Sequence, residues 1–190
     1  MSKIFIVRHG QSTDNAQDIL GGHRDSELTE TGREQARVVA EKLREHDIDV
    51  IYASPLKRAY ETAEIIARSN GFSQIIRDED LKERYFGVLT GKKVADIKNY
   101  SDNFIHSDGI DYFLDAEGAE DFPSTYKRAQ KVLSDIREKH PDKNVLIVTH
   151  GDIGKMIRAV YHGWSWEEGL KTPYFNNTEI LELSKKDIIE

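Results

Sequence analysis

The sequence predicts an α/β domain built on a mainly parallel sheet. Two short runs, 4–7 and 145–148, are apolar at every position, as expected of strands that are covered on both faces. Between these runs, strand patterns alternate with segments whose apolar residues recur at helical spacing. At 190 residues the chain is most simply one domain, 1–190, with a substantial core.

The first strand is followed by a polar, glycine-containing loop and then by a helix. Loops at the carboxyl end of a strand, such as 17–27 here, commonly carry binding residues. Thr29 has the position of a helix N-cap, and Glu30 lies in the first turn, where negative charge is favoured. The predicted helix ends near 46–47. One apolar face of it is formed by Ala36, Val39, Ala40 and Leu43.

A second strand and helix follow. The strand is expected at 50–53, and Ser54 with Pro55 predicts a helix start, as an N-cap and a proline in the first turn. The helix is expected to end at 70–71. Further short extended pieces are predicted at 75–76 and around Leu81.

The middle of the chain is its least regular part, with a weak helical pattern at 94–105. No lysine or arginine occurs from 99 to 126, while acidic residues accumulate, among them Asp108, Asp111, Asp115, Glu117, Glu120 and Asp121. We expect 92–124 to be an inserted cap or lid. The acidic stretch either favours a substrate with a single phosphate or a positive charge, or is only a solvated lid surface.

The rest of the chain returns to regular alternation of helix and strand. A helix with a clear apolar face ends at 139–141, and the strand at 145–148 follows it. The next helix is stopped by Gly163, and a last strand is expected at 180–183.

Both fully apolar strands end in the same dipeptide, His9-Gly10 and His150-Gly151. Ligands of open parallel sheets bind just beyond the carboxyl ends of the strands. If the two strands are neighbours, both imidazoles project into one crevice. Each histidine alone could be a polar strand-end residue, but the repeated context favours a site, with His9 as the candidate nucleophile.

Two arginines and a carboxylate complete the candidate site. Arg8 precedes His9, and Arg58 lies at a helix start, where a cation opposes the helix dipole unless an anion is also bound there. The alternative is that Arg58 is simply solvated. The planar guanidinium group of arginine matches the spacing of phosphoryl oxygens. Two arginines beside two histidines therefore indicate phosphoryl transfer. Glu83, one of 34 acidic residues, is the candidate proton donor for the leaving group.

Composition excludes several other classes. The net charge of -7 gives no general attraction to nucleic acid or to an anionic membrane. No cysteine is present, so disulfides and thiolate sites are excluded. No signal peptide or spanning segment is recognisable, and a cytoplasmic protein is expected. A metal hydrolase is disfavoured because two arginines would oppose a cation, and no H-E-x-x-H motif occurs.

Taken together, these residues resemble the phosphoglycerate mutase-like branch of the histidine phosphatase superfamily. The matching motifs cover most of the chain and are, in order, R-H-G-Q-S-T-D-N at 8–15, L-T-E-T-G at 28–32, S-P-L-K-R-A at 54–59, L-K-E-R-Y-F-G at 81–87 and V-T-H-G at 148–151. The resemblance implies a three-layer α/β/α sandwich and a phosphohistidine intermediate, with no metal or other cofactor.

The resemblance also assigns roles to individual residues. It implies that His9 is the nucleophile and that Glu83 is the proton donor. It implies that Arg8, Arg58 and His150 hold the transferring phosphoryl group. Residues expected to line the substrate pocket are Asn15, Gly22 and Gly151.

Three departures from the mutases of this branch favour a phosphatase acting on a small phosphorylated metabolite. The only basic residues between Arg84 and Lys127 are Lys92, Lys93 and Lys98, too few for a second anion site. The chain is shorter than those mutases, and Gly21 replaces a hydroxyl residue that is typical of them. A mutase remains the alternative, and a non-catalytic binding module is disfavoured because no catalytic residue is missing. The sequence does not determine the oligomeric state, so a homodimer stays open.

Overall fold

In residues 2–184, which the computed structural model describes, a five-stranded sheet forms the middle layer. Its strands are β1 (Ile4–Arg8), β2 (Val50–Ala53), β3 (Ile76–Arg77), β6 (Val145–Thr149) and β7 (Ile180–Leu183). Their order is β3-β2-β6-β1-β7, and only β7 runs antiparallel to its neighbour, β1. The prediction of a mainly parallel sheet is therefore confirmed.

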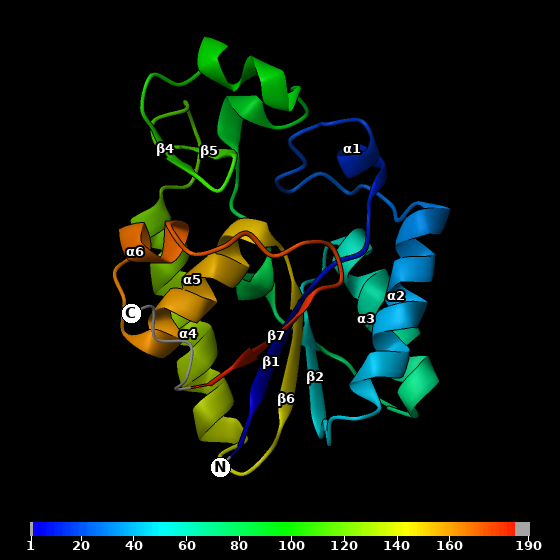
Figure 1. Cartoon of the computed structure of the whole chain (residues 1–190). Coiled ribbons are helices and arrows are strands. Elements are labelled where there is room, and N and C mark those ends of the chain that lie inside the picture. The colour runs from blue at the N-terminus through cyan, green and yellow to red at the C-terminus, as the bar shows by residue number, and fades with distance from the viewer. Residues whose placement is uncertain (1, 185–190) are drawn as a thin grey trace.

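Helices cover both faces of this sheet. They are α1 (Thr13–Ala16), α2 (Glu30–Leu43), α3 (Lys57–Asn70), α4 (Phe122–Lys139), α5 (Gly151–His162) and α6 (Trp166–Leu170). The helices α2 and α3 lie on one face, and α4, α5 and α6 lie on the other (Figure 1). This arrangement is the expected three-layer α/β/α sandwich.

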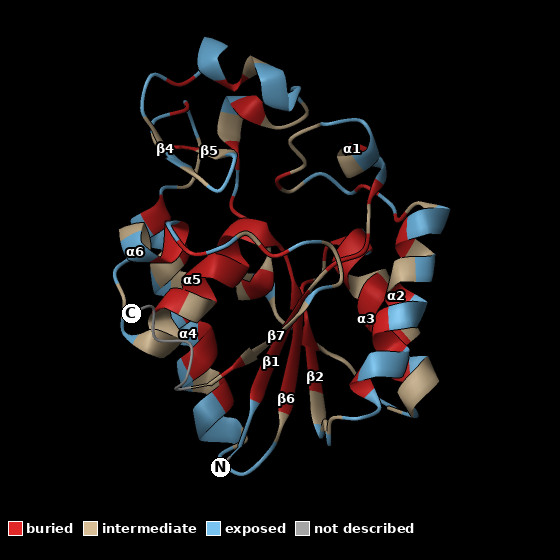
Figure 2. Cartoon of the chain, viewed as in Figure 1, coloured by how far each residue is buried: buried red, intermediate tan, exposed pale blue. Residues whose placement is uncertain are grey.

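Alternate side chains of the strands feed two separate cores. Phe5 and Val7 of β1 belong to the cluster shared with α2 and α3, whereas Ile4 and Ile6 belong to the cluster shared with α4 and α5. Figure 2 shows β1 and β6 buried along most of their length. A strand with a core on each face has to be apolar at every position, which explains the unbroken runs in the sequence.

Parallel pairing of β1 with β6 brings the two histidines together. Arg8 is in register with Thr149, and the His9 amide donates to the Thr149 carbonyl at 3.0 Å. His9 and His150 therefore leave neighbouring strands at the same edge of the sheet, which fulfils the condition for a shared site.

The helix start predicted at Ser54-Pro55 is wrong. Helix α3 begins at Lys57, after Leu56, and no side chain caps it. The Ser54 hydroxyl is instead 2.8 Å from Nε2 of His150, so a functional contact takes the place of the cap. Farther along, Leu81 lies not in an extended piece but in a 3-10 turn, η1 (Glu79–Leu81).

The weak helical pattern at 94–105 only partly describes the middle segment. A 3-10 helix, η3 (Val94–Asn99), is followed by an unpredicted hairpin of β4 (Phe104–Ser107) and β5 (Ile110–Phe113). The turn of this hairpin is Asp108-Gly109, with φ of 51° and 77°. An Asp-Gly pair with both residues at positive φ is a strong hairpin signal, and it was present in the sequence.

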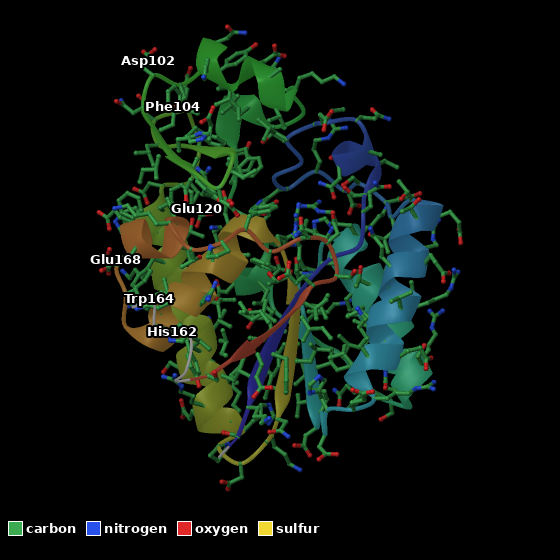
Figure 3. All side chains as sticks on the ribbon, in the orientation of Figure 1. Asp102, Phe104, Glu120, His162, Trp164 and Glu168 are labelled. Atoms are coloured by element: carbon green, nitrogen blue, oxygen red, sulfur yellow. The ribbon has the colours of Figure 1, made fainter. Side chains whose placement is uncertain are left out.

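The segment 92–124 stands above the carboxyl edge of the sheet (Figure 1), and its role as a cap stays a prediction. A small apolar cluster joins it to the preceding turn, with Phe86 from the turn and Ile97 and Phe113 from the segment. Figure 3 places Asp102 and Phe104 at its outer end and Glu120 nearer the helices below. Arg128 of α4 holds the Glu120 carboxylate with two bonds of 2.7 and 2.8 Å, which fixes the base of the segment. Within residues 2–184, no helix combines the length and apolarity needed to cross a membrane.

Candidate active site

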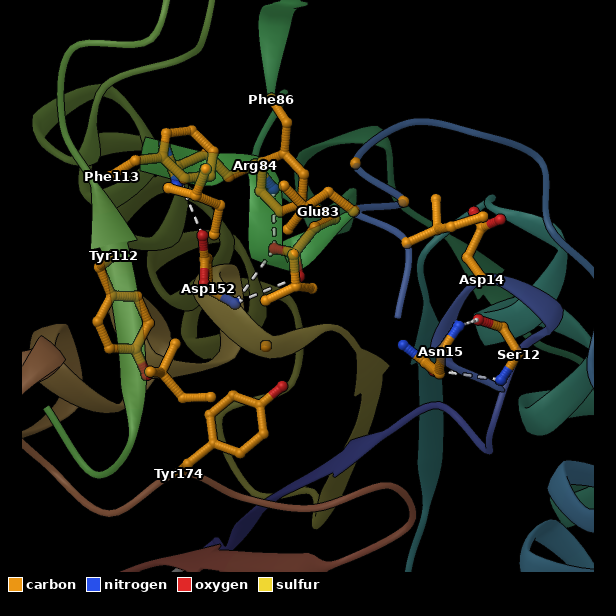
Figure 4. A pocket seen from close by; sticks show the side chains of 18 of the residues that line it. Ser12, Asp14, Asn15, Glu83, Arg84, Phe86, Tyr112, Phe113, Asp152 and Tyr174 are labelled. Carbon is orange, nitrogen blue, oxygen red and sulfur yellow. Dashed lines mark hydrogen bonds and ion pairs between the residues drawn. The ribbon is translucent and has the colours of Figure 1, made fainter. Parts of the chain in front are cut away.

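A cavity of about 250 Å³ lies between the carboxyl edge of the sheet and the segment 92–124. Predicted site residues that line it are Arg8, His9, Asn15, Gly22, Arg58, Glu83 and Gly151. Figure 4 shows Glu83 and Tyr174 on one side of it and Asn15, Ser12 and Asp14 on the other. The structure thus gathers residues from five distant parts of the chain around one pocket.

The ring of His9 is held in one tautomer. The side chain is 3% exposed, and Nδ1 lies 2.7 Å from the carbonyl oxygen of Gly10, while Nε2 lies 3.1 Å from Nε of Arg58. Because Arg58 Nε can only donate and a carbonyl can only accept, the proton is on Nδ1 and the lone pair is on Nε2. Burial and the charges of Arg58 and Arg8 lower the pKa of His9 well below its ordinary value, so the ring is a neutral nucleophile.

Arg58 is buried beside His9, in the first turn of α3 as predicted. Its two terminal nitrogens donate to the carbonyls of Arg24 and Gly22, both at 2.8 Å. Gly22 has φ of 49°, a conformation that glycine adopts readily, and this turn aims its carbonyl at the guanidinium. Burial lowers the pKa of Arg58 to about 10, so the side chain stays charged near neutral pH.

Arg8 lies against the loop between α6 and β7. Its guanidinium carbon is 4.8 Å from the centre of the Tyr174 ring, and Nη1 donates to the Phe175 carbonyl at 3.4 Å. Its buried Nε has no hydrogen-bond partner within the described residues. Asn177 in the same loop donates to the His9 carbonyl at 2.6 Å. This loop therefore orients both Arg8 and His9.

His150 is fully buried and makes an edge contact with the His9 ring, with 5.0 Å between ring centres. Nε2 lies 2.8 Å from the Ser54 hydroxyl, and Nδ1 has no hydrogen-bond partner among the described residues. Burial, together with the charge of Arg58, lowers the pKa of His150 well below its ordinary value. Unlike His9, it is behind the cavity wall rather than in the lining.

Glu83 sits at the N-terminus of α5. Its Oε1 accepts backbone N–H bonds from Arg84 at 2.8 Å, Asp152 at 3.2 Å and Ile153 at 3.3 Å. Nε2 of His23 lies 2.6 Å from its carbonyl oxygen, which fixes the backbone at this position. Burial, and next the charge of Asp152, raise the pKa of Glu83, which favours the protonated acid.

The sequence reasoning gave Arg84 no role. Its Nε donates to Asp152 at 2.8 Å (Figure 4). Its guanidinium lies over the rings of Phe113 and Phe122, at 4.0 and 4.2 Å from their centres. Arg84 therefore joins the segment 92–124 to α4 and α5. Nothing in the local sequence signals this contact, because its partners lie 29 or more positions away.

The two remaining predicted lining residues also face the cavity. The Asn15 side chain accepts from the Ser12 amide at 3.1 Å, which completes the capping box of α1. Gly151 opens α5, and a side chain there would lie 3.6 Å from Glu83 Oε2 and 3.5 Å from the Tyr174 hydroxyl. Glycine keeps the space in front of the carboxyl group open.

The whole arrangement suits transfer of one phosphoryl group. It offers a neutral ring nitrogen, the guanidinium groups of Arg8 and Arg58 in the same cavity, and a carboxyl group whose pKa is raised by burial. Among residues 2–184, no group of three or more histidine and carboxylate side chains is arranged to hold a metal ion.

Comparisons with known proteins agree with this geometry. Phosphoglycerate mutase-like protein 4 of Arabidopsis thaliana is 37% identical over 164 residues, which are 84% of this chain and 70% of that protein. The metal-independent phosphoserine phosphatase of the same plant is 35% identical over 165 residues, 85% of this chain and 68% of that protein.

Among solved structures, the phosphoserine phosphatase of Entamoeba histolytica in complex with 3-phosphoglyceric acid has a TM-score of 0.80 and 29% sequence identity, covering 96% of this chain and 90% of its own. The family model for the histidine phosphatase superfamily (branch 1) matches residues 4–187. The resemblance drawn from the motifs is confirmed, and the chain belongs to the histidine phosphatase superfamily.

Proposed function

We propose that the chain is a phosphatase that hydrolyses a small phosphomonoester through a phosphohistidine on His9. One observation carries this proposal: the lone pair of neutral His9 faces Arg58 at 3.1 Å, in the same cavity as Arg8 and the buried Glu83. These are the nucleophile, the charge-neutralising groups and the proton donor that the reaction needs.

In the first step, the hydrogen bond from Arg58 Nε to Nε2 of His9 is released, Nε2 attacks phosphorus and the ester P–O bond breaks. Glu83 gives its proton to the departing alkoxide oxygen, and the hydrogen bond from Nδ1 to the Gly10 carbonyl supports the charge that develops on the ring. Arg8 and Arg58 neutralise the equatorial oxygens. The predicted role of His150 requires its unpartnered Nδ1, which lies outside the cavity lining, to come within reach of one of these oxygens.

In the second step, the Glu83 carboxylate takes a proton from water as the water oxygen attacks phosphorus. The P–N bond breaks, inorganic phosphate is released and the His9 lone pair is restored. Glu83 ends the cycle protonated, so acid and base roles alternate on one residue.

The relatives support a small phosphorylated substrate, since two of them are named phosphoserine phosphatases. A mutase has to hold a second anionic group while the phosphoryl group moves. Among the described lining residues the cations are Arg8, Arg58 and Arg84, and Arg84 is paired with Asp152. The cavity therefore favours hydrolysis over mutase chemistry. A homodimer stays a prediction that no contact tests.

The test is hydrolysis of p-nitrophenyl phosphate by the purified chain. We expect activity that survives a metal chelator and is blocked by vanadate, and an acid-labile phosphoenzyme in rapidly quenched samples. His9→Ala should lose at least about 10⁴-fold in kcat and all of the phosphoenzyme. His140→Ala, at the opposite end of the sheet, is the control. Near-normal turnover in His9→Ala would overturn the proposal.

A further inference from the structure

Tyr112, one of the residues that line the cavity, has a buried hydroxyl that the proposed mechanism does not use. Tyr112 belongs to β5 and lines the cavity, yet it is 2% exposed and its hydroxyl has no hydrogen-bond partner among the described residues. Buried hydroxyl groups are nearly always paired, and an unpaired one is costly. A ligand that supplies a partner here would recover that cost.

Beside its polar groups, the lining of the cavity contains a set of apolar residues, the apolar wall. The segment 92–124 contributes Val94, Ile97, Ile110 and Phe113, and the facing loops contribute Ile19, Leu20 and Phe86. Aliphatic and aromatic side chains from three separate segments thus converge on the part of the cavity above the phosphoryl site. Such a lining favours an apolar ligand body with a few placed polar groups.

The charges near this wall are already paired with one another. Asp111 lies 3.8 Å from Nζ of Lys98 and 2.7 Å from Nδ1 of His106, and neither cation lines the cavity. Asp14 is likewise paired with Arg24, at 3.2 Å. No described lysine lines the cavity, so this wall offers neither a free cation for a second anion nor an unpaired carboxylate for an amine.

Tyr174 marks the boundary between this wall and the reacting groups. Its ring lies against Arg8, and Figure 4 shows it next to Tyr112, with its hydroxyl directed to the middle of the pocket. The phosphoryl group and the apolar wall are therefore adjacent parts of one cavity. A monoester bound with phosphorus at His9 extends its alcohol portion towards Tyr112.

We propose that the substrate is the monophosphate of an uncharged, largely apolar alcohol that carries one hydrogen-bonding group for the Tyr112 hydroxyl. This inference rests on the proposed function, which it deepens from phosphomonoesters in general to one class of leaving group. Tyr112 is then a specificity-determining residue. A leaving group with a carboxylate, a second phosphate or an ammonium group is a poor fit.

The first part of the test varies the length of the alkyl chain of the substrate while the ester bond that is broken stays the same. Ethyl, butyl and hexyl phosphate have leaving groups of nearly equal acidity, so differences among them report contact with the wall. We expect kcat/KM to rise about two- to fourfold for each methylene group until the cavity is filled. Phosphoserine, phosphoethanolamine and 3-phosphoglycerate should lie at least about tenfold below butyl phosphate.

The second part tests the hydroxyl itself. The purified chain should prefer 4-hydroxybutyl or 6-hydroxyhexyl phosphate over the matching alkyl phosphate, and Tyr112→Phe should lower that ratio about tenfold. Tyr112→Phe keeps the ring and its packing, and its rate with unsubstituted butyl phosphate reports any general damage. Tyr100→Phe, on an exposed tyrosine of the same segment, is the control.

The outcomes separate this inference from the function on which it rests. A flat alkyl series, a preference for phosphoserine or 3-phosphoglycerate, or an unchanged hydroxyl preference in Tyr112→Phe would each overturn the inference while leaving a phosphatase. Failure to hydrolyse any ester, p-nitrophenyl phosphate included, would overturn the proposed function and the inference with it.

Discussion

Replacing Glu83 with glutamine removes one proton and little else. The three backbone N–H groups that bond Oε1 of Glu83, at 2.8 to 3.3 Å, meet an equivalent amide oxygen in the variant. The fold should therefore survive. What is lost is general acid catalysis, which is worth about 10²- to 10⁴-fold, or about 2.7 to 5.5 kcal/mol in the activation free energy.

The loss should depend on the leaving group. Butyl phosphate releases a strongly basic alkoxide and should show the full loss in Glu83→Gln, whereas p-nitrophenolate needs little protonation and should lose less than about tenfold. Because Glu83 also serves as the base for water, steady-state turnover slows for both esters. The diagnostic quantity is the first step, measured as the p-nitrophenol burst and as phosphoenzyme formation from labelled butyl phosphate.

A matched control is available on the surface. Glu79, whose side chain is 74% exposed, lies four residues before Glu83, and Glu79→Gln should leave both first-step rates unchanged. Equal losses for the two esters in Glu83→Gln would remove Glu83 from the acid role. Thermal unfolding of the variant, measured alongside, checks that its fold is retained.

Two further outcomes follow from the same geometry. The pH profile of kcat/KM should be bell-shaped. On the acid side, activity falls as His9 is protonated, at a pH below the ordinary histidine pKa of 6.5 because burial lowers the pKa of His9. On the alkaline side, activity falls as Glu83 ionises, at a pH above the ordinary glutamate pKa of 4.5 because burial raises the pKa of Glu83. The pH profile of the Glu83→Gln variant should keep the fall on the acid side and lose the fall on the alkaline side. If the alkaline fall persists in this variant, it belongs to another group. Arg58→Lys should lower kcat/KM about 10²- to 10³-fold, because an ammonium cannot replace the fork that reaches His9 and the carbonyls of Arg24 and Gly22. Arg68→Lys, on the exposed face of the same helix, should have no effect. Similar rates in both variants would contradict the role of Arg58 in holding the phosphoryl group.

The reactive end of the site was predictable because its signals are local. A strand with a core on each face is apolar throughout, so β1 and β6 were evident, and parallel pairing placed His9 beside His150. Arg58 was noticed because a cation at a helix start is unfavourable without an anion. In each case a few consecutive residues carried the physical constraint.

The substrate end was not predictable in the same way. Tyr174 and Asn177 reach the site because β7 lies antiparallel beside β1, which returns the preceding loop to the carboxyl edge of β1. That pairing is decided by the tertiary fold, not by the pattern of 180–183. Ser54 had the sequence of a cap, but its contact with His150 prevailed. The Asp108-Gly109 turn, in contrast, was a local signal that the sequence reasoning overlooked.

The division of the molecule into separate cores has an evolutionary consequence. His9 and His150 end the two central strands, whereas Phe113 belongs to a small apolar cluster outside the two cores of the sheet. Tyr112, its neighbour in β5, packs into the core shared with α4 and α5. Substitutions in the small cluster leave the packing of the sheet unchanged, so the preference for an alcohol can drift while the chemistry is inherited intact. For the engineer, a graft of 92–124 from a relative has to preserve Tyr112 and Phe122, which pack into the core shared with α4 and α5.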